Sequence, residues 1–266
     1  MSLRIQTNVE AFNAQRHLSA TTDRIQTAME RLSSGYRINR AADDAAGLSI
    51  SEKLQAQING LDQASRNAQD GVSLVQTAEG SLDEVHEMLQ RVRELAVQYK
   101  NGTLSTEDRA AIQSEVNQLA SEVERIGSSV EFNGIKLLSS AGSVTFQVGA
   151  NDGEVISVST ISLGSTVGTS AFALGGASDI DEIDTAIANV SAQRTTLGAV
   201  QNRLDHALNA LSTYQENLVS SESRIKDVDM ASEMVEYTKL QVLQQAGTSV
   251  LAQANQSGQG VLSLLR

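Results

Sequence analysis

The residues best able to do chemistry in this 266-residue chain do not combine into a catalytic site. The chain has three histidines and no cysteine, which excludes disulfides and thiolate metal sites. The segment from His86 to Gln90 comes within one residue of the zinc-protease pattern H-E-x-x-H, but Gln90 stands where the second zinc ligand is required. Neither a Walker A loop nor a G-x-G-x-x-G loop occurs. We therefore expect no enzymatic activity, no metal site and no cofactor.

Charged residues cluster in two places that structural roles explain. Asp43 and Asp44 precede a long apolar repeat without a calcium-binding loop around them, so they are predicted to lie at a helix N-terminus, where the dipole favours negative charge. Arg91 and Arg93 flank an apolar position next to Glu94, which is typical of a solvated helix face.

The overall charge disfavours several partners. Lys and Arg number 20 against 32 Asp and Glu, a net charge of −12, and this opposes binding to nucleic acid or to an anionic membrane. The first 18 residues carry charges where a secretory signal needs an apolar stretch, so we expect no cleaved signal peptide. Residues 240–265 lack charge altogether, but their density of glutamine predicts a protein interior rather than membrane insertion.

The elements that must carry these residues are long helices. The chain contains no proline, and apolar residues recur at spacings of four and three from Leu54 to Ala96. This pattern predicts one helix over about residues 49–100, which at 1.5 Å per residue is about 80 Å long, and hence an elongated molecule.

Two further helices are predicted to pack against the first. A turn at Asn101-Gly102 precedes Ser105 and Asp108, which form an N-terminal capping signature for a second apolar repeat over residues 112–130. A third repeat runs from Ile183 to Ile225. The short turn makes the first two helices antiparallel neighbours, and three such helices can close one slender bundle.

Between the second and third repeats the apolar period changes to two. Val144, Phe146 and Val148 alternate before the turn at residues 151–153, and Ile156 and Val158 follow it, which predicts a β-hairpin. The stretch 163–178 is rich in Gly, Ser, Thr and Ala and is predicted to be a surface excursion.

The two ends of the chain are predicted to be amphipathic helices. Apolar residues from Ile5 to Leu32 define the first, which should end before Ser33. The uncharged segment 240–265 defines the second, and such a helix gains little from ordering alone in water. We expect both ends to be largely disordered in a monomer and to fold on assembly.

Three separated motifs resemble bacterial flagellin. The run Ser33-Ser34-Gly35-Tyr36-Arg37-Ile38-Asn39 followed by Ala42-Asp43-Asp44-Ala45-Ala46-Gly47-Leu48-Ser49-Ile50 is similar to the family's N-terminal signature. Ser223 to Ala231, with Gln253 to Gln256 and Val261 to Arg266, resembles the C-terminal pattern, and Phe132 to Leu138 resembles the entry into the hairpin region. The likeness covers about residues 1–140 and 180–266. Ser257-Gly258 falls where many flagellins have proline, and the variable outer domains are missing.

The resemblance implies a mainly α fold, a long antiparallel helical bundle with a small β-hairpin region at about 135–178. It implies that residues 1–44 and 225–266 form a filament's inner tube as a coiled coil of terminal helices, and that residues 45–224 form its outer tube. Repeated heterologous contacts that do not close into a ring generate such a fibre. The expected inner-tube assembly residues are Ile5, Val9, Phe12, Leu243, Val250, Leu251, Val261, Leu262, Leu264 and Leu265.

The resemblance also implies an extracellular structural subunit for swimming motility, exported unfolded by the flagellar type III system. Its implied partners are other flagellin subunits, a secretion chaperone, a filament cap and hook-associated junction proteins. Host Toll-like receptor 5 is a further implied partner of the monomer, with Arg91, Leu95 and Glu115 as the expected contacts. The whole expected receptor-recognition and subunit-interface set is Gln90, Arg91, Arg93, Glu94, Leu95, Val97 and Glu115.

Two alternatives use the same helices differently. A hook-filament junction protein of the same superfamily would share the terminal helices, although the full Asp43 to Leu48 run favours a filament subunit. A cytosolic coiled-coil scaffold would explain the heptads but not the hairpin. The peptidase that some flagellins carry is excluded, since residues 139–178 are too few and contain no histidine.

Overall fold

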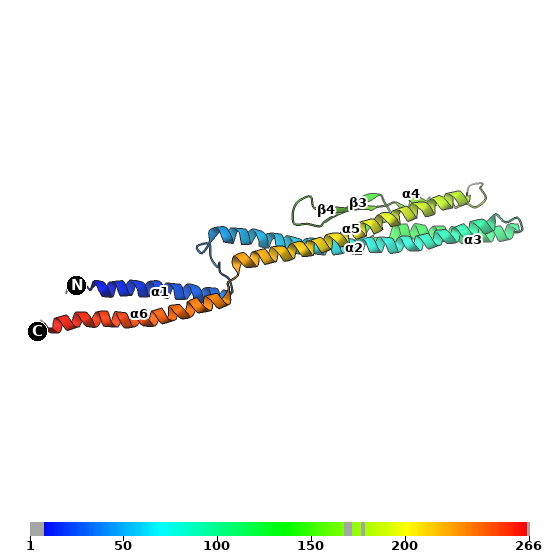
Figure 1. Ribbon diagram of the computed structural model, residues 1–266. Coiled ribbons are helices and arrows are strands. Elements are labelled where there is room, and N and C mark those ends of the chain that lie inside the picture. The colour runs from blue at the N-terminus through cyan, green and yellow to red at the C-terminus, as the bar shows by residue number, and fades with distance from the viewer. Residues whose placement is uncertain (1–7, 168–171, 177–178, 265–266) are drawn as a thin grey trace. The chain divides into compact units, whose positions relative to one another are not determined.

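The computed structural model describes residues 8–167, 172–176 and 179–264 (Figure 1). The chain folds as two compact units. The terminal unit comprises Met1–Ala56 and Asn217–Arg266, and the central unit comprises Gln57–Glu216. The division falls within the helices α2 (Ala45–Tyr99) and α5 (Asp179–Lys226), whereas the sequence placed its domain boundaries near the ends of these helices.

The central unit is an antiparallel bundle of α2, α3 (Thr106–Ser129) and α5 (Figure 1). Side-chain pairs between α2 and α5 join Asp62 to Gln215, Asp83 to Arg194 and Arg93 to Asp184. Because residue numbers rise on one helix as they fall on the other, the two helices run in opposite directions. The predicted bundle is confirmed.

The apolar repeat of α2 forms the core of this bundle. Its members from Ile58 onwards are buried at nearly every heptad position, and Leu82, Val85, Leu89 and Val92 have no exposed surface. They pack with Val116 and Val123 of α3 and with Val190 and Leu204 of α5. The fully buried seam explains how this helix stays ordered, since a lone helix of this kind is only marginally stable in water.

Side chains fix where the helices begin. The Asp44 carboxylate accepts the Gly47 N–H at 2.9 Å, so α2 starts at Ala45, four residues before the predicted start. At α3, Ser105 and Asp108 form the predicted capping box with reciprocal bonds of 3.1 Å. Asp43 instead accepts the backbone N–H of Arg40 and, with a smaller effect, that of Asn39, and these bonds lower the pKa of its carboxyl group.

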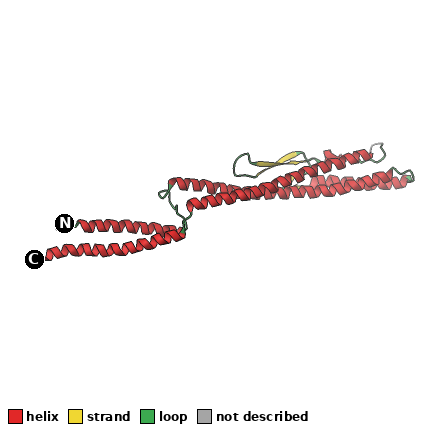
Figure 2. Cartoon of the chain, viewed as in Figure 1, coloured by secondary structure: helices red, strands yellow, loops and turns green. Residues whose placement is uncertain are grey.

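The predicted β-hairpin is confirmed (Figure 2). β3 (Gly142–Gln147) pairs antiparallel with β4 (Val155–Thr160), and Val144 lies opposite Val158. A shorter pair precedes it, β1 (Glu131–Phe132) with β2 (Ile135–Lys136), and the turn between them places Asn133 and Gly134 at positive φ. Glycine suits that turn because it adopts left-handed φ without steric cost.

The prediction of a surface excursion over 163–178 is wrong for the described part of that stretch. A short helix, α4 (Leu163–Val167), begins it, and Leu163 and Val167 are buried in the core of the bundle, as are Phe172 and Leu174 further on. Gln113 of α3 bonds to the backbone of residues 172 and 174 at 3.0 and 2.8 Å. Composition suggested a loop because large apolar residues are sparse there, but the four that the structure describes, Leu163, Val167, Phe172 and Leu174, are all buried.

The terminal unit is built on the antiparallel pair α1 (Val9–Ser34) and α6 (Met230–Leu264). Near one end of the pair, the Asn8 side-chain amide donates to the Ala254 carbonyl at 2.8 Å. Near the other end, the Arg31 guanidinium lies 3.8 Å from the Glu233 carboxylate. α1 runs to Ser34, slightly further than predicted, and ends at Gly35 in the left-handed conformation. The predicted pairing of the terminal helices as a coiled coil is confirmed.

Candidate functional site

The paired helices α1 and α6 bury very little apolar surface between them. Among their described side chains only Ala28, Leu240 and Ala254 are buried apolar residues. Large apolar side chains instead lie on the outside, each about half exposed or more: Val9, Phe12, Met29, Met230, Met234, Val235, Val242, Leu243 and Val250. Soluble monomers rarely expose so many large apolar residues on two neighbouring helices, so this surface is the first candidate for a functional contact.

Of the ten expected inner-tube residues, four fall on this surface, and they are four of the five whose side chains the structure describes. Phe12 is 59% exposed, Val250 58%, Val9 53% and Leu243 48%, while Leu251 is half-buried. Val261, Leu262 and Leu264 lie on α6 in a stretch whose side chains the structure does not describe. Ile5 and Leu265 lie outside the described residues.

The sequence analysis overlooked the first half of α6. Met234, Val235, Thr238, Lys239 and Val242 lie together on one open face of this helix. Val235 is the most exposed large apolar residue described, at 71%. The signal was present in the spacing, because residues 234, 238 and 242 recur every four positions and share one helix face. The charged neighbours Glu236 and Lys239, which pair with each other at 3.0 Å, obscured it.

The second candidate surface lies on the central unit, around Arg91 of α2. Its guanidinium bonds to Glu115 of α3 at 2.9 Å and to Glu94 one turn along at 3.2 Å. The bond to Glu115, followed by that to Glu94, raises the pKa of Arg91. The expected recognition residues Arg91 and Glu115 are thus brought together in one exposed ion-pair network.

Arg93, two residues beyond Arg91 on α2, links this helix to α5. It bonds to Asp184 of α5 at 2.5 Å, which raises the pKa of Arg93 and lowers the pKa of Asp184. Exposed pairs of this kind contribute little to folding stability. Their effect is to hold charges of both signs at fixed places on the surface.

Leu95 does not belong to this surface. The sequence analysis grouped it with the recognition residues, but its side chain is only 2% exposed and packs in the core of the bundle. It belongs to the buried side of α2, which also carries Val92 and Ala96. Gln90, Arg93 and Glu94 are exposed, and Val97 is 51% exposed.

The described residues show neither metal chemistry nor a membrane span. Within them no group of three or more His, Cys, Asp or Glu side chains is placed to hold a metal ion. No helix in the described ranges combines the length and hydrophobicity needed to cross a membrane. Gln90 stands where the zinc pattern has its second histidine, and its side-chain amide nitrogen lies 2.9 Å from the His86 ring nitrogen Nε2.

Comparison with known proteins identifies the family to which this chain belongs. Residues 5–143 match the model of the bacterial flagellin N-terminal helical region, and residues 180–265 match that of the C-terminal helical region. The chain belongs to the bacterial flagellin family. It is 52% identical to the flagellin of Halalkalibacterium halodurans over 97% of this chain and 98% of that protein. It is 46% identical to the flagellin of Bacillus subtilis over 99% of this chain and the whole of that protein.

Solved structures agree on the fold. The crystal structure of Bacillus cereus flagellin matches with a TM-score of 0.51 and 31% identity, over 55% of this chain and 88% of that one. A putative flagellar hook-associated protein from Vibrio parahaemolyticus matches with a TM-score of 0.59, over 70% of this chain and all of that one, but at 18% identity it shows the fold alone. Flagellins are structural proteins of the flagellar filament and not enzymes, so this chain is a structural component that polymerises with other flagellin subunits.

Proposed function

We propose that α1 and α6 form the inner tube of the filament, and that the exposed apolar residues on these helices are the contacts that join subunits there. The observation that carries this proposal is the half-exposed set on α1 and α6, against only three buried apolar residues among the side chains of these helices that the structure describes. Burying a fully exposed side chain of this kind is worth roughly 1.5–3 kcal/mol, and because these side chains are already about half buried, each gains roughly half of that when a neighbouring copy covers it. In the same proposal, the central unit contributes to the outer tube.

Point substitutions on α6 test this proposal without changing the core. Val235→Ser and Val242→Ser should leave the secondary structure and thermal stability of the monomer nearly unchanged, because both side chains already face solvent. The subunit concentration needed for seeded polymerisation should rise by at least about tenfold for the double variant, the equivalent of about 1.4 kcal/mol for the two substitutions together. Sedimentation and negative-stain electron microscopy measure it.

Val155→Ser is the matched control, since Val155 is 42% exposed but lies on the hairpin of the central unit. We expect it to polymerise as the unaltered protein does. A variant lacking residues 240–266 should form no tubes. Normal tubes from that truncated chain would refute the assignment of α6 to the inner tube.

Sequence identity favours a filament subunit over a junction protein. The relatives at 46–52% identity are flagellins aligned over nearly their full length, whereas the hook-associated match is at 18% identity and reflects the shared fold. A filament subunit should extend seeds into long tubes. A junction protein would cap or bind seeds without elongating them.

We further infer that the chain reaches the cell exterior unfolded through the flagellar type III system, without cleavage of a signal peptide, and then meets a filament cap and hook-associated junction proteins. The apolar face of α6 needs cover before export, which is the role proposed for a secretion chaperone. Mass spectrometry of filament subunits should find an uncleaved N-terminus. Pull-down with immobilised residues 217–266 should lose the chaperone when Val235 and Val242 are changed to Ser.

Recognition of the monomer by Toll-like receptor 5 is proposed through Arg91 and Glu115. Both are exposed and bonded to each other, so together they present a fixed pair of charges. Arg91→Ala should lower receptor signalling at least about tenfold, as expected for a hot-spot arginine. The control is Arg125→Ala, which removes a comparable exposed pair with Glu122 on α3. Equal losses in both variants would reject the assignment. Leu95 is left out because its replacement would damage the core.

A further inference from the structure

The sulfur atoms of this chain are concentrated on the terminal helices. The chain has five methionines, no cysteine and no tryptophan, so the methionine sulfurs are its most easily oxidised atoms. Met29 of α1 and Met230 and Met234 of α6 are each about half exposed. Met88 of α2 is partly buried against the core of the central unit, and Met1 lies outside the described residues. A dissolved oxidant therefore reaches three of the four described methionines more readily than the fourth.

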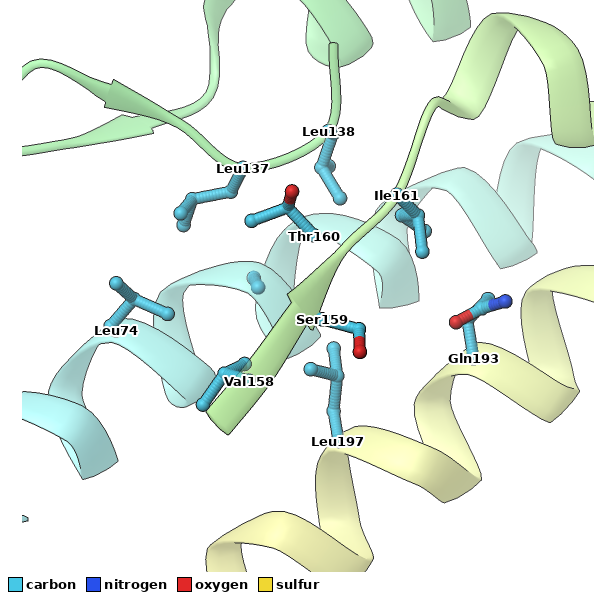
Figure 3. Close-up of a pocket in the computed structure, with 10 residues that line it drawn as sticks. Leu74, Leu137, Leu138, Val158, Ser159, Thr160, Ile161, Gln193 and Leu197 are labelled. Atoms are coloured by element: carbon cyan, nitrogen blue, oxygen red, sulfur yellow. The ribbon is translucent and has the colours of Figure 1, made fainter. Parts of the chain in front are cut away.

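The core against which Met88 packs is closely filled. Its neighbour Leu89 has no exposed surface. The cavity that remains near the hairpin, between Leu74, Val158 and Leu197, has a volume of about 10 Å³ (Figure 3). This is about the space that one water needs, and hydrogen peroxide is larger than water. Packing thus shields the methionine of the central unit and leaves those of the terminal unit open.

The three exposed methionines lie near one end of the paired helices. Arg31 of α1 pairs with Glu233 of α6, and the two helices are antiparallel, so Met29 lies about level with Met234. Met230 and Met234 are four residues apart and share one face of α6. We call Met29, Met230 and Met234 the terminal methionines.

The thioether of Met234 lies on a surface that assembly would cover. Met234 belongs to the open face of α6 that also carries Val235 and Val242. In the filament proposed above, a neighbouring subunit buries such exposed apolar residues. Methionine suits a contact of this kind because its side chain is flexible, polarizable and apolar. That suitability depends on the sulfur remaining reduced.

Reaction with hydrogen peroxide changes the polarity of these side chains. The sulfur donates an electron pair to one peroxide oxygen, so that an S–O bond forms as the O–O bond breaks. The other oxygen leaves with both hydrogens as water, and the sulfur is oxidised to a sulfoxide while the peroxide is reduced. The sulfoxide oxygen is a hydrogen-bond acceptor, and burying it without a donor is unfavourable.

The donors on the same face as Met234 are already bonded. The Thr238 hydroxyl donates to the Met234 carbonyl at 2.8 Å, and the Lys239 ammonium pairs with the Glu236 carboxylate at 3.0 Å. A sulfoxide at residue 234 that a neighbouring subunit covered would have to compete for these donors. Oxidation should therefore oppose the burial that assembly requires.

We propose that the terminal methionines are an oxidation site of the free subunit and that their conversion to sulfoxide hinders polymerisation. The second half of the proposal rests on the filament function proposed above. The modification is reversible, because methionine sulfoxide reductases restore the thioether. The terminal methionines thus make assembly sensitive to hydroperoxides without any cysteine.

Oxidation rates on the free chain test the site without polymerisation. The folded protein is treated with hydrogen peroxide, and peptide mass spectrometry follows the sulfoxide at each methionine. We expect each terminal methionine to oxidise at least about threefold faster than Met88, and the rates to converge in urea, where burial is lost. Met88 oxidising as fast as the terminal methionines in the folded chain would overturn the assignment.

Seeded polymerisation tests the effect on assembly. The subunit concentration that polymerisation needs should rise at least about tenfold after oxidation, as expected for a buried acceptor without a donor. Sulfoxide reductases with a thiol reductant should restore it, and the thiol has no disulfide to reduce in this chain. Normal polymerisation of a chain with all three sulfoxides would refute this half of the proposal. Failure of the untreated chain to polymerise would count against the filament function, whereas the oxidation rates test the site independently.

Leucine replacements assign the effect to the terminal methionines. Leucine is apolar and similar in volume to methionine, and it has no sulfur to oxidise. The triple variant Met29→Leu, Met230→Leu, Met234→Leu should polymerise equally before and after peroxide treatment. Met88→Leu is the matched control and should stay as sensitive to peroxide as the unaltered chain. Loss of polymerisation in the oxidised triple variant would place the effect on Met1 or Met88 and overturn the proposal.

Discussion

The two units of this chain use the same heptad periodicity for opposite purposes. In the central unit the repeats of α2, α3 and α5 meet in one continuous core, and residues such as Leu82, Leu89 and Val116 have no exposed surface. In the terminal unit the paired helices α1 and α6 bury only Ala28, Leu240 and Ala254 among their described apolar residues. They expose most of the large apolar side chains that the structure describes there. Three helices can enclose a seam between them, whereas two can cover only one side of each other.

This difference shows that an apolar repeat does not by itself reveal where its partner lies. The central unit satisfies its repeats within one chain. The terminal unit exposes the side chains of Phe12, Val235 and Val250 to solvent. We expect a subunit that is stable alone and also polymerises to combine two kinds of unit. One has a complete apolar core, and the other has exposed apolar residues that neighbouring subunits cover.

The largest expected contrast comes from paired leucine truncations. Leu89→Ala should destabilise the central unit by about 2–5 kcal/mol, because it leaves a cavity in a fully buried core. Leu243→Ala, at a residue 48% exposed, should change monomer stability by about 0.5 kcal/mol or less but reduce polymerisation. Chemical denaturation and sedimentation measure the two effects. Similar destabilisation by both variants would remove the distinction between the units.

Hydrogen exchange on the monomer should sharpen the contrast along the backbone. Amides of α6 should exchange much faster than those of α2 between residues 74 and 96, because few buried contacts hold α6 in place. This agrees with the expectation that the chain ends order on assembly. Protection in α6 equal to that in α2 would contradict it, and polymerised protein provides the comparison in which α6 should become protected.

Two glycine substitutions should have smaller effects of opposite sign. Gly35→Ala should destabilise the end of α1 by about 1 kcal/mol, because Gly35 has a φ of 76° and alanine is strained there. Gly80→Ala in the central unit should stabilise α2 by about 1 kcal/mol, since the site is open and helical. Thermal unfolding followed by circular dichroism measures both. A loss of stability in Gly80→Ala would show that the space around it is not free.

The smallest expected effect concerns the ion pair between Arg93 and Asp184. Its pairing holds the pKa of Asp184 below the ordinary value of 3.8, so the pair stabilises the fold above that pH and loses its effect as the pH falls through the lowered pKa. The stability difference between the unaltered protein and Asp184→Asn should be constant near neutral pH and vanish in strong acid. Asp205→Asn, at an exposed α5 residue for which the described residues provide no ion pair, is the control. A difference that grows on acidification would have the wrong sign.

Much of the fold was predictable because its signals are local. The heptads of α2, the capping box at Ser105 and the alternation of Val144 with Phe146 each depend on neighbours within a few residues. The flagellin motifs at both ends allowed the family to be recognised as well. The open face of α6 that carries Met234, Thr238 and Val242 was also readable from its spacing, although the charged residues Glu236 and Lys239 obscured it.

What the sequence by itself determined is therefore which long segments are helical and, at Ser105, where one of them begins, and it predicted that the faces at the chain ends need partners. Only the tertiary structure decided that Leu95 faces the core, that Leu163 and Phe172 are buried despite their loop-like surroundings, and that the hairpin lies against Gly60 and Gly71. Periodicity identifies an apolar face but not the distant residues that cover it. Those contacts join segments tens of residues apart, and they depend on how closely two backbones can approach.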